Sequence, residues 1–153
     1  MLGTRRVSSS SAETPVAGAG PVMLATLGVP FDEAAAVVAV DAAVEAGQPL
    51  LVVNVTEIPI LPVSMSLGYE YLATDEVEAS LRAPADLAAS LAVMVELLRV
   101  SSPRPTEALL QLVGERAPGL LVLGPDRSRL GRRRYAKTVR KLRDRAPCLL
   151  WLA

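Results

Sequence analysis

The chain has 153 residues, of which 51% are hydrophobic and only 3% aromatic, so it has the length of one ordinary domain with a core of alanine, valine and leucine. Its 16 basic residues balance its 16 acidic ones, so the overall charge does not favour a polyanionic partner. The sequence contains no histidine, which excludes Ser–His and Cys–His catalysis and any histidine-ligated metal site.

The N-terminal segment differs in composition from the rest of the chain. Residues 1–20 are rich in serine, alanine and glycine, and we expect a disordered tail ahead of a single domain over 21–153. Arg5 and Arg6 are not followed by an apolar segment, so no export signal is predicted. No segment has the roughly 18 consecutive apolar residues of a membrane helix. The single cysteine, Cys148, rules out an intramolecular disulfide and favours a reducing, cytoplasmic compartment.

Apolar runs then begin to alternate with helical patterns. Residues 22–27 are a short apolar run that predicts a buried strand. The next segment begins with two acids, Asp32 and Glu33, and ends at Gly47, which predicts a helix over 32–47. The continuous apolar and β-branched run 50–55 predicts a second buried strand.

The middle of the chain is less regular. Residues 56–74 form a long linker, which we interpret as irregular surface or as a functional lid. A helix with an acidic first turn is predicted to begin near Thr74, and Pro84 is expected to interrupt and restart it. Residues 93–100 predict a strand. Thr106 is then expected to cap a further helix.

The last third completes the pattern. Residues 119–123 predict a strand, 132–144 a basic helix and 147–152 the final strand, in which Cys148 is interpreted as a core thiol. Five apolar strands alternating with helices predict an α/β fold, a doubly wound three-layer sandwich of Rossmann-like type with a parallel sheet.

Several segments also resemble parts of one known family. Residues 25–30 resemble the first strand and loop of universal stress proteins, residues 101–105 their proline-containing turn, and 120–124 with 146–150 their C-terminal third. The resemblance covers roughly residues 20–153. It implies a five-stranded parallel sheet in the order 3-2-1-4-5 and a cytoplasmic role in stress response. It also implies a homodimer formed through the last strand, at Cys148, Leu149, Leu150 and Trp151.

Family members that bind ATP carry the pattern G-x2-G-x9-G-S/T after the fourth strand. Placed without gaps, this pattern falls on Gly124, Arg127, Lys137 and Thr138, so only the first glycine and the final hydroxyl are kept. The two lost glycines matter because a backbone approaches phosphate closely only where no Cβ intrudes. Leu27 stands where nucleotide-binding members have an acid. We therefore expect no cofactor and no ATP bound in the usual mode, with another way of binding a nucleotide as the alternative.

The charge distribution keeps an anion site open. Ten of the sixteen basic residues lie in one segment: Arg127, Arg129, Arg132, Arg133, Arg134, Lys137, Arg140, Lys141, Arg143 and Arg145. Arginine forks match phosphate geometry. The alternative is a solvated basic helix face, partly paired with acids such as Glu70, Asp75, Glu76 and Glu78, whose buried side is marked by Tyr135, Val139 and Leu142.

The candidate site combines these residues with the first loop. An anion or nucleotide would contact Thr26, Gly28, Gly124, Arg127, Arg129, Arg133, Lys137 and Thr138. Nucleic acid is disfavoured, because the segment lacks interleaved aromatic residues and any known binding motif.

Three functions follow from the sequence. The first is a non-catalytic regulatory protein of the universal stress protein type. The second is a binding module for a nucleotide or another phosphorylated small molecule at the basic loop 124–138. The third, an enzyme of the related nucleotide α-hydrolase type acting through Thr138, is weakened by the missing histidine and the altered loop.

Overall fold

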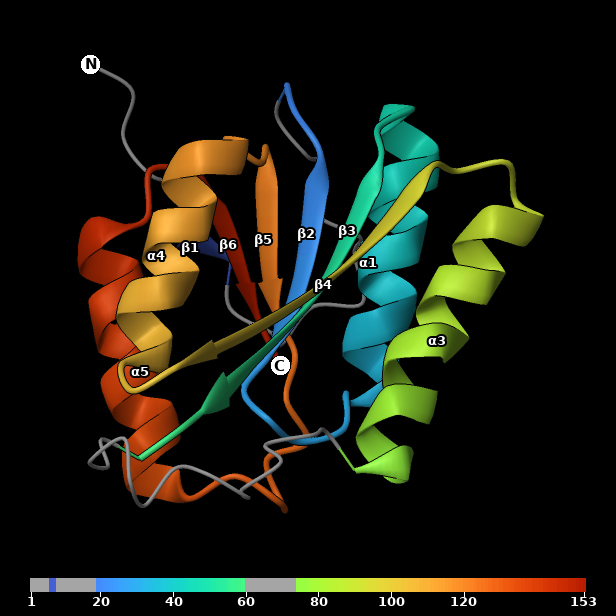
Figure 1. The fold of residues 1–153 in the computed structure, drawn as a ribbon. Coiled ribbons are helices and arrows are strands. Elements are labelled where there is room, and N and C mark those ends of the chain that lie inside the picture. Colours follow the sequence, from blue (N-terminus) through green and yellow to red (C-terminus); the bar gives the residue numbers. More distant parts are fainter. Residues whose placement is uncertain (1–5, 8–18, 60–73) are drawn as a thin grey trace.

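A parallel sheet forms the centre of the molecule (Figure 1). The computed structural model describes residues 6–7, 19–59 and 74–153. The five predicted strands are β2 (Val22–Thr26), β3 (Leu50–Glu57), β4 (Val95–Ser102), β5 (Leu120–Leu123) and β6 (Leu149–Leu152). They pair in parallel in the order β4-β3-β2-β5-β6, which confirms the predicted order 3-2-1-4-5.

A sixth strand lies outside β6. The two-residue strand β1 (Arg6–Val7) pairs in parallel with β6, in the register Arg6↔Leu150 and Val7↔Trp151. The tail expected over 1–20 did not include this strand, because two residues show no periodicity in sequence. Strand β6 pairs with β5 along one edge, and the backbone groups of β1 pair with the other edge of β6. The other tail residues up to 18 lie outside the described residues.

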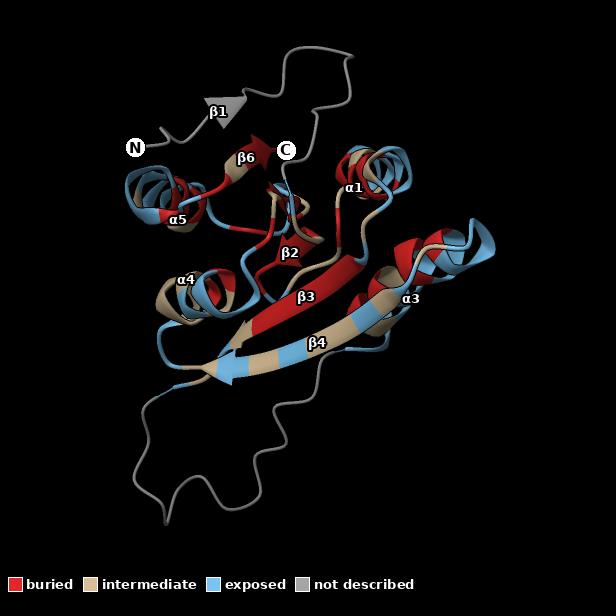
Figure 2. Ribbon diagram, turned by 90° about the horizontal axis from the view of Figure 1, so that it is seen from above, coloured by how far each residue is buried: buried red, intermediate tan, exposed pale blue. Residues whose placement is uncertain are grey.

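Helices cover both faces of the sheet (Figure 2). Helices α1 (Glu33–Ala46) and α3 (Asp75–Ser90) pack on one face, and α4 (Pro105–Arg116) and α5 (Arg132–Arg145) on the other. Successive side chains of β2 point to opposite faces of the sheet, so Met23 belongs to the core under α4 and α5 and Leu24 to the core under α1 and α3. The predicted doubly wound three-layer sandwich is thereby confirmed.

The predicted ends of α1 are confirmed. The Asp32 carboxylate accepts hydrogen bonds from the N–H groups of Ala34 at 2.8 Å and Ala35 at 3.4 Å. Gly47 follows the helix with φ +63°, a left-handed conformation that glycine adopts without strain.

Helix α3 is longer than expected. Thr74 caps it, as its hydroxyl accepts from the N–H of Val77 at 3.3 Å. The expected interruption at Pro84 is wrong, because one helix continues from Asp75 to Ser90. A proline removes a single helical hydrogen bond, and the burial of Leu81 and Ala88 against the sheet holds the helix together around it.

The start of α4 also differs from expectation. Arg104 occupies the capping position without a side-chain hydrogen bond, and Pro105 is the first helical residue. The expected cap at Thr106 is therefore wrong. Strands β3 and β4 reach two residues beyond their predicted ends because Glu57 pairs with Ser102. Within the linker expected over 56–74, residues 60–73 lie outside the described part.

Candidate functional site

The switch point of the sheet lies between β2 and β5. From β2 the chain continues through α1 to β3 on one side, and from β5 through α5 to β6 on the other. Open α/β sheets bind ligands in the crevice at the carboxyl ends of such strands. Three of the predicted site residues, Thr26, Gly28 and Gly124, lie at this edge.

The loops after β2 and β5 are tied to each other. The N–H of Asp32 donates to the carbonyl of Gly124 at 2.9 Å, and the N–H of Asp126 donates to the carbonyl of Pro30 at 2.8 Å. Phe31 and Pro125 form an antiparallel bridge between these two bonds. The two loops therefore close against each other across the switch point.

Hydrogen bonds also satisfy most of the backbone N–H groups in the loop after β5. The Asp126 carboxylate accepts from the hydroxyl of Ser128 at 2.7 Å and from its N–H at 3.0 Å, and these bonds lower the pKa of Asp126. The Asp126 carbonyl accepts from the N–H groups of Arg129 at 3.0 Å and Leu130 at 3.2 Å. The N–H of Gly124 donates to Ala25 at 2.9 Å. Phosphate binding by a loop needs free N–H groups, and those of Gly124, Asp126, Ser128, Arg129 and Leu130 are already bonded.

Gly124 has a structural role of its own. A Cβ at this position would lie 2.4 Å from the Cβ of Ala35 on α1. The glycine that the binding pattern retains is therefore required for the close approach of α1 to β5.

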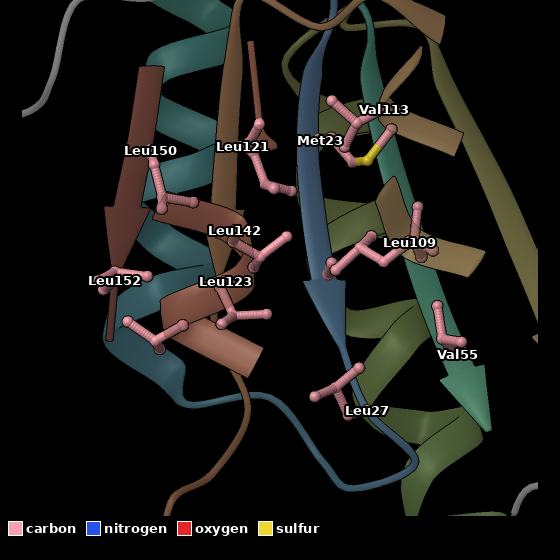
Figure 3. Close-up of a cluster of buried hydrophobic side chains, with 14 of the residues drawn as sticks. Met23, Leu27, Val55, Leu109, Val113, Leu121, Leu123, Leu142, Leu150 and Leu152 are labelled. Atoms are coloured by element: carbon pink, nitrogen blue, oxygen red, sulfur yellow. The ribbon is translucent and has the colours of Figure 1, made fainter. Parts of the chain in front are cut away.

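Apolar side chains fill the end of β2. Leu27 is 1% exposed and lies in one core cluster with Val55 and Leu123 (Figure 3). Leu130 belongs to the same cluster. Leu130 comes from the loop after β5 itself and is 5% exposed. At the position where an acid would face a nucleotide, this chain extends its hydrophobic core.

Thr26 and Gly28 are held by internal hydrogen bonds. The buried Thr26 hydroxyl donates to the carbonyl of Val29 at 2.7 Å. Gly28 adopts φ +73°, and its N–H donates to the Asn54 side-chain oxygen at 2.9 Å. Asn54 was not among the predicted site residues, although a lone amide in an apolar strand is a signal that the sequence contains. The loop is thereby fixed from β3.

Two of the predicted arginines anchor the loop after β5. The Arg127 guanidinium lies 4.3 Å from the centre of the Tyr135 ring. Arg129 forms a bidentate ion pair with Glu76 at 2.8 and 3.0 Å, and its hydrogen bonds lower the pKa of Glu76. The pairing with acids that the sequence suggested is confirmed for Glu76, whereas Glu78 pairs with Arg99 and Glu70 lies outside the described residues.

The other predicted site residues lie on α5. Arg133 and Lys137 are exposed, and Tyr135, Val139 and Leu142 form the buried side as predicted. Thr138 is 2% exposed and its hydroxyl is 3.0 Å from that of Thr106. Lys137 and Thr138 border a separate hollow between α4 and α5, so the predicted set is divided between two places.

Cys148 provides a test of the packing at the start of β6. Its side chain is buried, and this burial raises its pKa from 9.0 to about 11. At pH 8 the thiolate fraction of Cys148 should be roughly 100-fold lower than that of a thiol with a pKa of 9.0, since each pKa unit is a factor of ten. We expect the native protein to react with a disulfide reagent at least that much more slowly than the urea-unfolded protein. Equal rates would show that the thiol is exposed.

Residues 6–7, 19–59 and 74–153 contain no group of three or more cysteine, aspartate or glutamate side chains placed to hold a metal ion. None of the helices found there is long and apolar enough to cross a membrane.

Comparison with solved structures identifies the fold. A universal stress protein family protein from Burkholderia pseudomallei matches with a TM-score of 0.60 at 18% identity, covering 89% of this chain and 98% of that one. A universal stress protein in complex with cAMP matches with a TM-score of 0.59 at 19% identity, covering 89% of this chain and 98% of that one. The universal stress protein from Archaeoglobus fulgidus in complex with dAMP matches with a TM-score of 0.60 at 15% identity, covering 87% of this chain and 96% of that one. No family model and no curated protein matches the sequence.

Proposed function

We propose that this chain, which has the universal stress protein fold, is a divergent member of that family and acts as a non-catalytic, cytoplasmic regulatory protein in stress response. In this proposal it binds no nucleotide at the switch point between β2 and β5. The observation that carries the proposal is the loop after β5, whose N–H groups at Gly124, Asp126, Ser128, Arg129 and Leu130 are all bonded internally.

The filled crevice supports the same proposal. Two structural neighbours were crystallised with cAMP and dAMP. In this chain a ligand at the switch point would have to displace the buried side chains of Leu27 and Leu130 and break the bonds between the loops. A phosphate group cannot replace those apolar contacts.

Calorimetry with the full chain tests the proposal. ATP with Mg²⁺ and cAMP should give no saturable heat at concentrations up to about 1 mM, which corresponds to binding weaker than about −4 kcal/mol. The universal stress protein that was crystallised with cAMP serves as the positive control. A micromolar Kd for either of the two nucleotides at the loops after β2 and β5 would overturn the proposal.

A second candidate function is a binding module for a phosphorylated molecule at the basic loop 124–138. Arg133 favours it, because this side chain is exposed and makes no hydrogen bond or ion pair within the described part of the chain. Arg127 and Arg129 weaken it, since both are engaged internally. The variant Arg133→Glu should abolish anion binding if the loop is the site, and unchanged binding would exclude this function.

We also include a homodimer through the edge of β6 in the proposal. In the structure β1 occupies that edge at Leu150 and Trp151. Two copies of β6 can pair through their backbones only after β1 has moved away. Deleting residues 1–18 should therefore raise the dimer fraction measured by light scattering. A monomer mass that does not change on deletion would contradict this part of the proposal.

A further inference from the structure

The hollow between α4 and α5 offers a second place where an anion could bind. It has a volume of about 370 Å³, within the range of small-ligand pockets. The loop before α4, one side of α5 and the end of β3 border this hollow, which is open to solvent. Its lining residues are Glu57, Pro103, Arg104, Pro105, Thr106, Glu107, Arg134, Lys137, Thr138 and Lys141.

Positive charge predominates in the hollow. Four of the lining side chains are basic and two are acidic. Glu107 accepts from Lys141 at 3.3 Å and from Arg145 at 2.9 Å, and these hydrogen bonds lower the pKa of Glu107. The side chains of Arg104 and Lys137 form no hydrogen bond or ion pair with any residue that the structure describes. Two cations of the hollow therefore have no counter-ion within it.

Arg134 contributes a buried donor. Its Nη2 atom lies 3.2 Å from the Oε2 atom of Glu57, yet it is buried and makes no hydrogen bond within the described residues. A buried donor without a hydrogen bond is costly, and most such groups in proteins find a partner. An anionic oxygen in the hollow would supply that partner.

The beginning of α4 adds to this arrangement. No side chain caps this 12-residue helix, and Pro105 has no N–H. The Thr106 and Glu107 N–H groups have no intrahelical acceptor, so the positive end of the helix dipole faces the hollow. The Thr106 hydroxyl, now 3.0 Å from that of Thr138, is also within the lining.

We propose that this hollow binds the phosphate group of a small phosphomonoester that also carries hydroxyl groups. The phosphate lies between Arg104, Lys137 and Arg134, because arginine and lysine recognise phosphate by charge-assisted hydrogen bonds. The Glu57 and Glu107 carboxylates accept from the hydroxyl groups of the ligand. They also repel a second phosphate, which disfavours polyphosphates and nucleic acid.

This inference goes beyond the proposed function and does not depend on it. The hollow shares no residue with the loops that close the switch point. Binding of a sugar phosphate here leaves the first proposed function unchanged, and binding of a nucleotide at the switch point leaves this inference unchanged. The hollow shares Arg134, Lys137 and Thr138 with the segment 124–138 of the second candidate function, from which it differs by not including Arg133.

Titration of the full chain with inorganic phosphate and with ribose 5-phosphate at low salt tests the inference. We expect the sugar phosphate to bind about tenfold more tightly than inorganic phosphate, and ribose without phosphate not to bind. The exposed side chains Arg104 and Lys137 can be replaced without disturbing the core, and Arg104→Ala and Lys137→Ala should each weaken binding by about tenfold.

Arg140→Ala is the matched control, because Arg140 is exposed on α5 and does not line the hollow. It should change the affinity by less than about twofold. Unchanged binding in Arg104→Ala and Lys137→Ala would overturn the inference. So would an equal loss in Arg140→Ala, because that result indicates non-specific attraction to the basic helix.

Discussion

Replacing Leu27 by aspartate is expected to lower the free energy of unfolding by about 3–5 kcal/mol. Leu27 is 1% exposed and packs among apolar residues from both closing loops, so the new carboxylate would be buried without a cationic partner in the core cluster. The measurement is urea denaturation at neutral pH. The substitution restores an acid at this position, yet it does not free the bonded N–H groups of the loop after β5, so we expect no gain in nucleotide binding.

Leu27→Met is the control for this substitution. Methionine keeps the volume and the apolar character, so its effect should stay below about 1.5 kcal/mol. Equal stabilities of the two variants would mean that the end of β2 is open to solvent, and the description of a filled crevice would then be wrong.

Replacing Gly124 by alanine is expected to lower the free energy of unfolding by about 1–3 kcal/mol. The added Cβ would lie 2.4 Å from the Cβ of Ala35, so α1 would have to move away from β5. The effect is steric, because Gly124 is not among the glycines with positive φ.

Gly114→Ala is expected to change the free energy of unfolding in the opposite direction. Gly114 lies inside α4, and a Cβ there meets nothing within 4 Å. Alanine should therefore stabilise the protein by about 0.5–1 kcal/mol through its higher helix propensity. A Gly124→Ala variant as stable as the native protein would show that α1 does not depend on this close approach.

Most of the fold could be predicted from the sequence because its signals are local. Continuous apolar runs mark the buried parallel strands, and Asp32 and Gly47 mark the ends of α1 through capping chemistry. The uninterrupted α3 and the strand β1 could not be predicted, since packing against the sheet holds Pro84 within α3 and pairing with a distant edge forms β1. Such interactions join residues that are far apart in the sequence.

The candidate site was harder to predict for the same reason. The sequence showed that Leu27 and Arg127 depart from the family's binding pattern, but it could not show that Gly124 serves the packing of α1. Nor could it show that Arg129 pairs with Glu76, which lies 53 residues away. The hollow combines Arg104 and Glu57 with α5, and neither residue belongs to the basic segment.

A residue-resolved titration tests the central claim most directly, namely that the switch point is closed to nucleotides. The full chain labelled with ¹⁵N is titrated with AMP, and backbone amide signals are followed by NMR. We predict no saturable shift for residues 26–31 and 124–130, whereas shifts confined to residues 104–107 and 134–141 would report binding in the hollow between α4 and α5 instead. Saturable shifts of Gly28, Asp126 and Ser128 at micromolar AMP would contradict the claim.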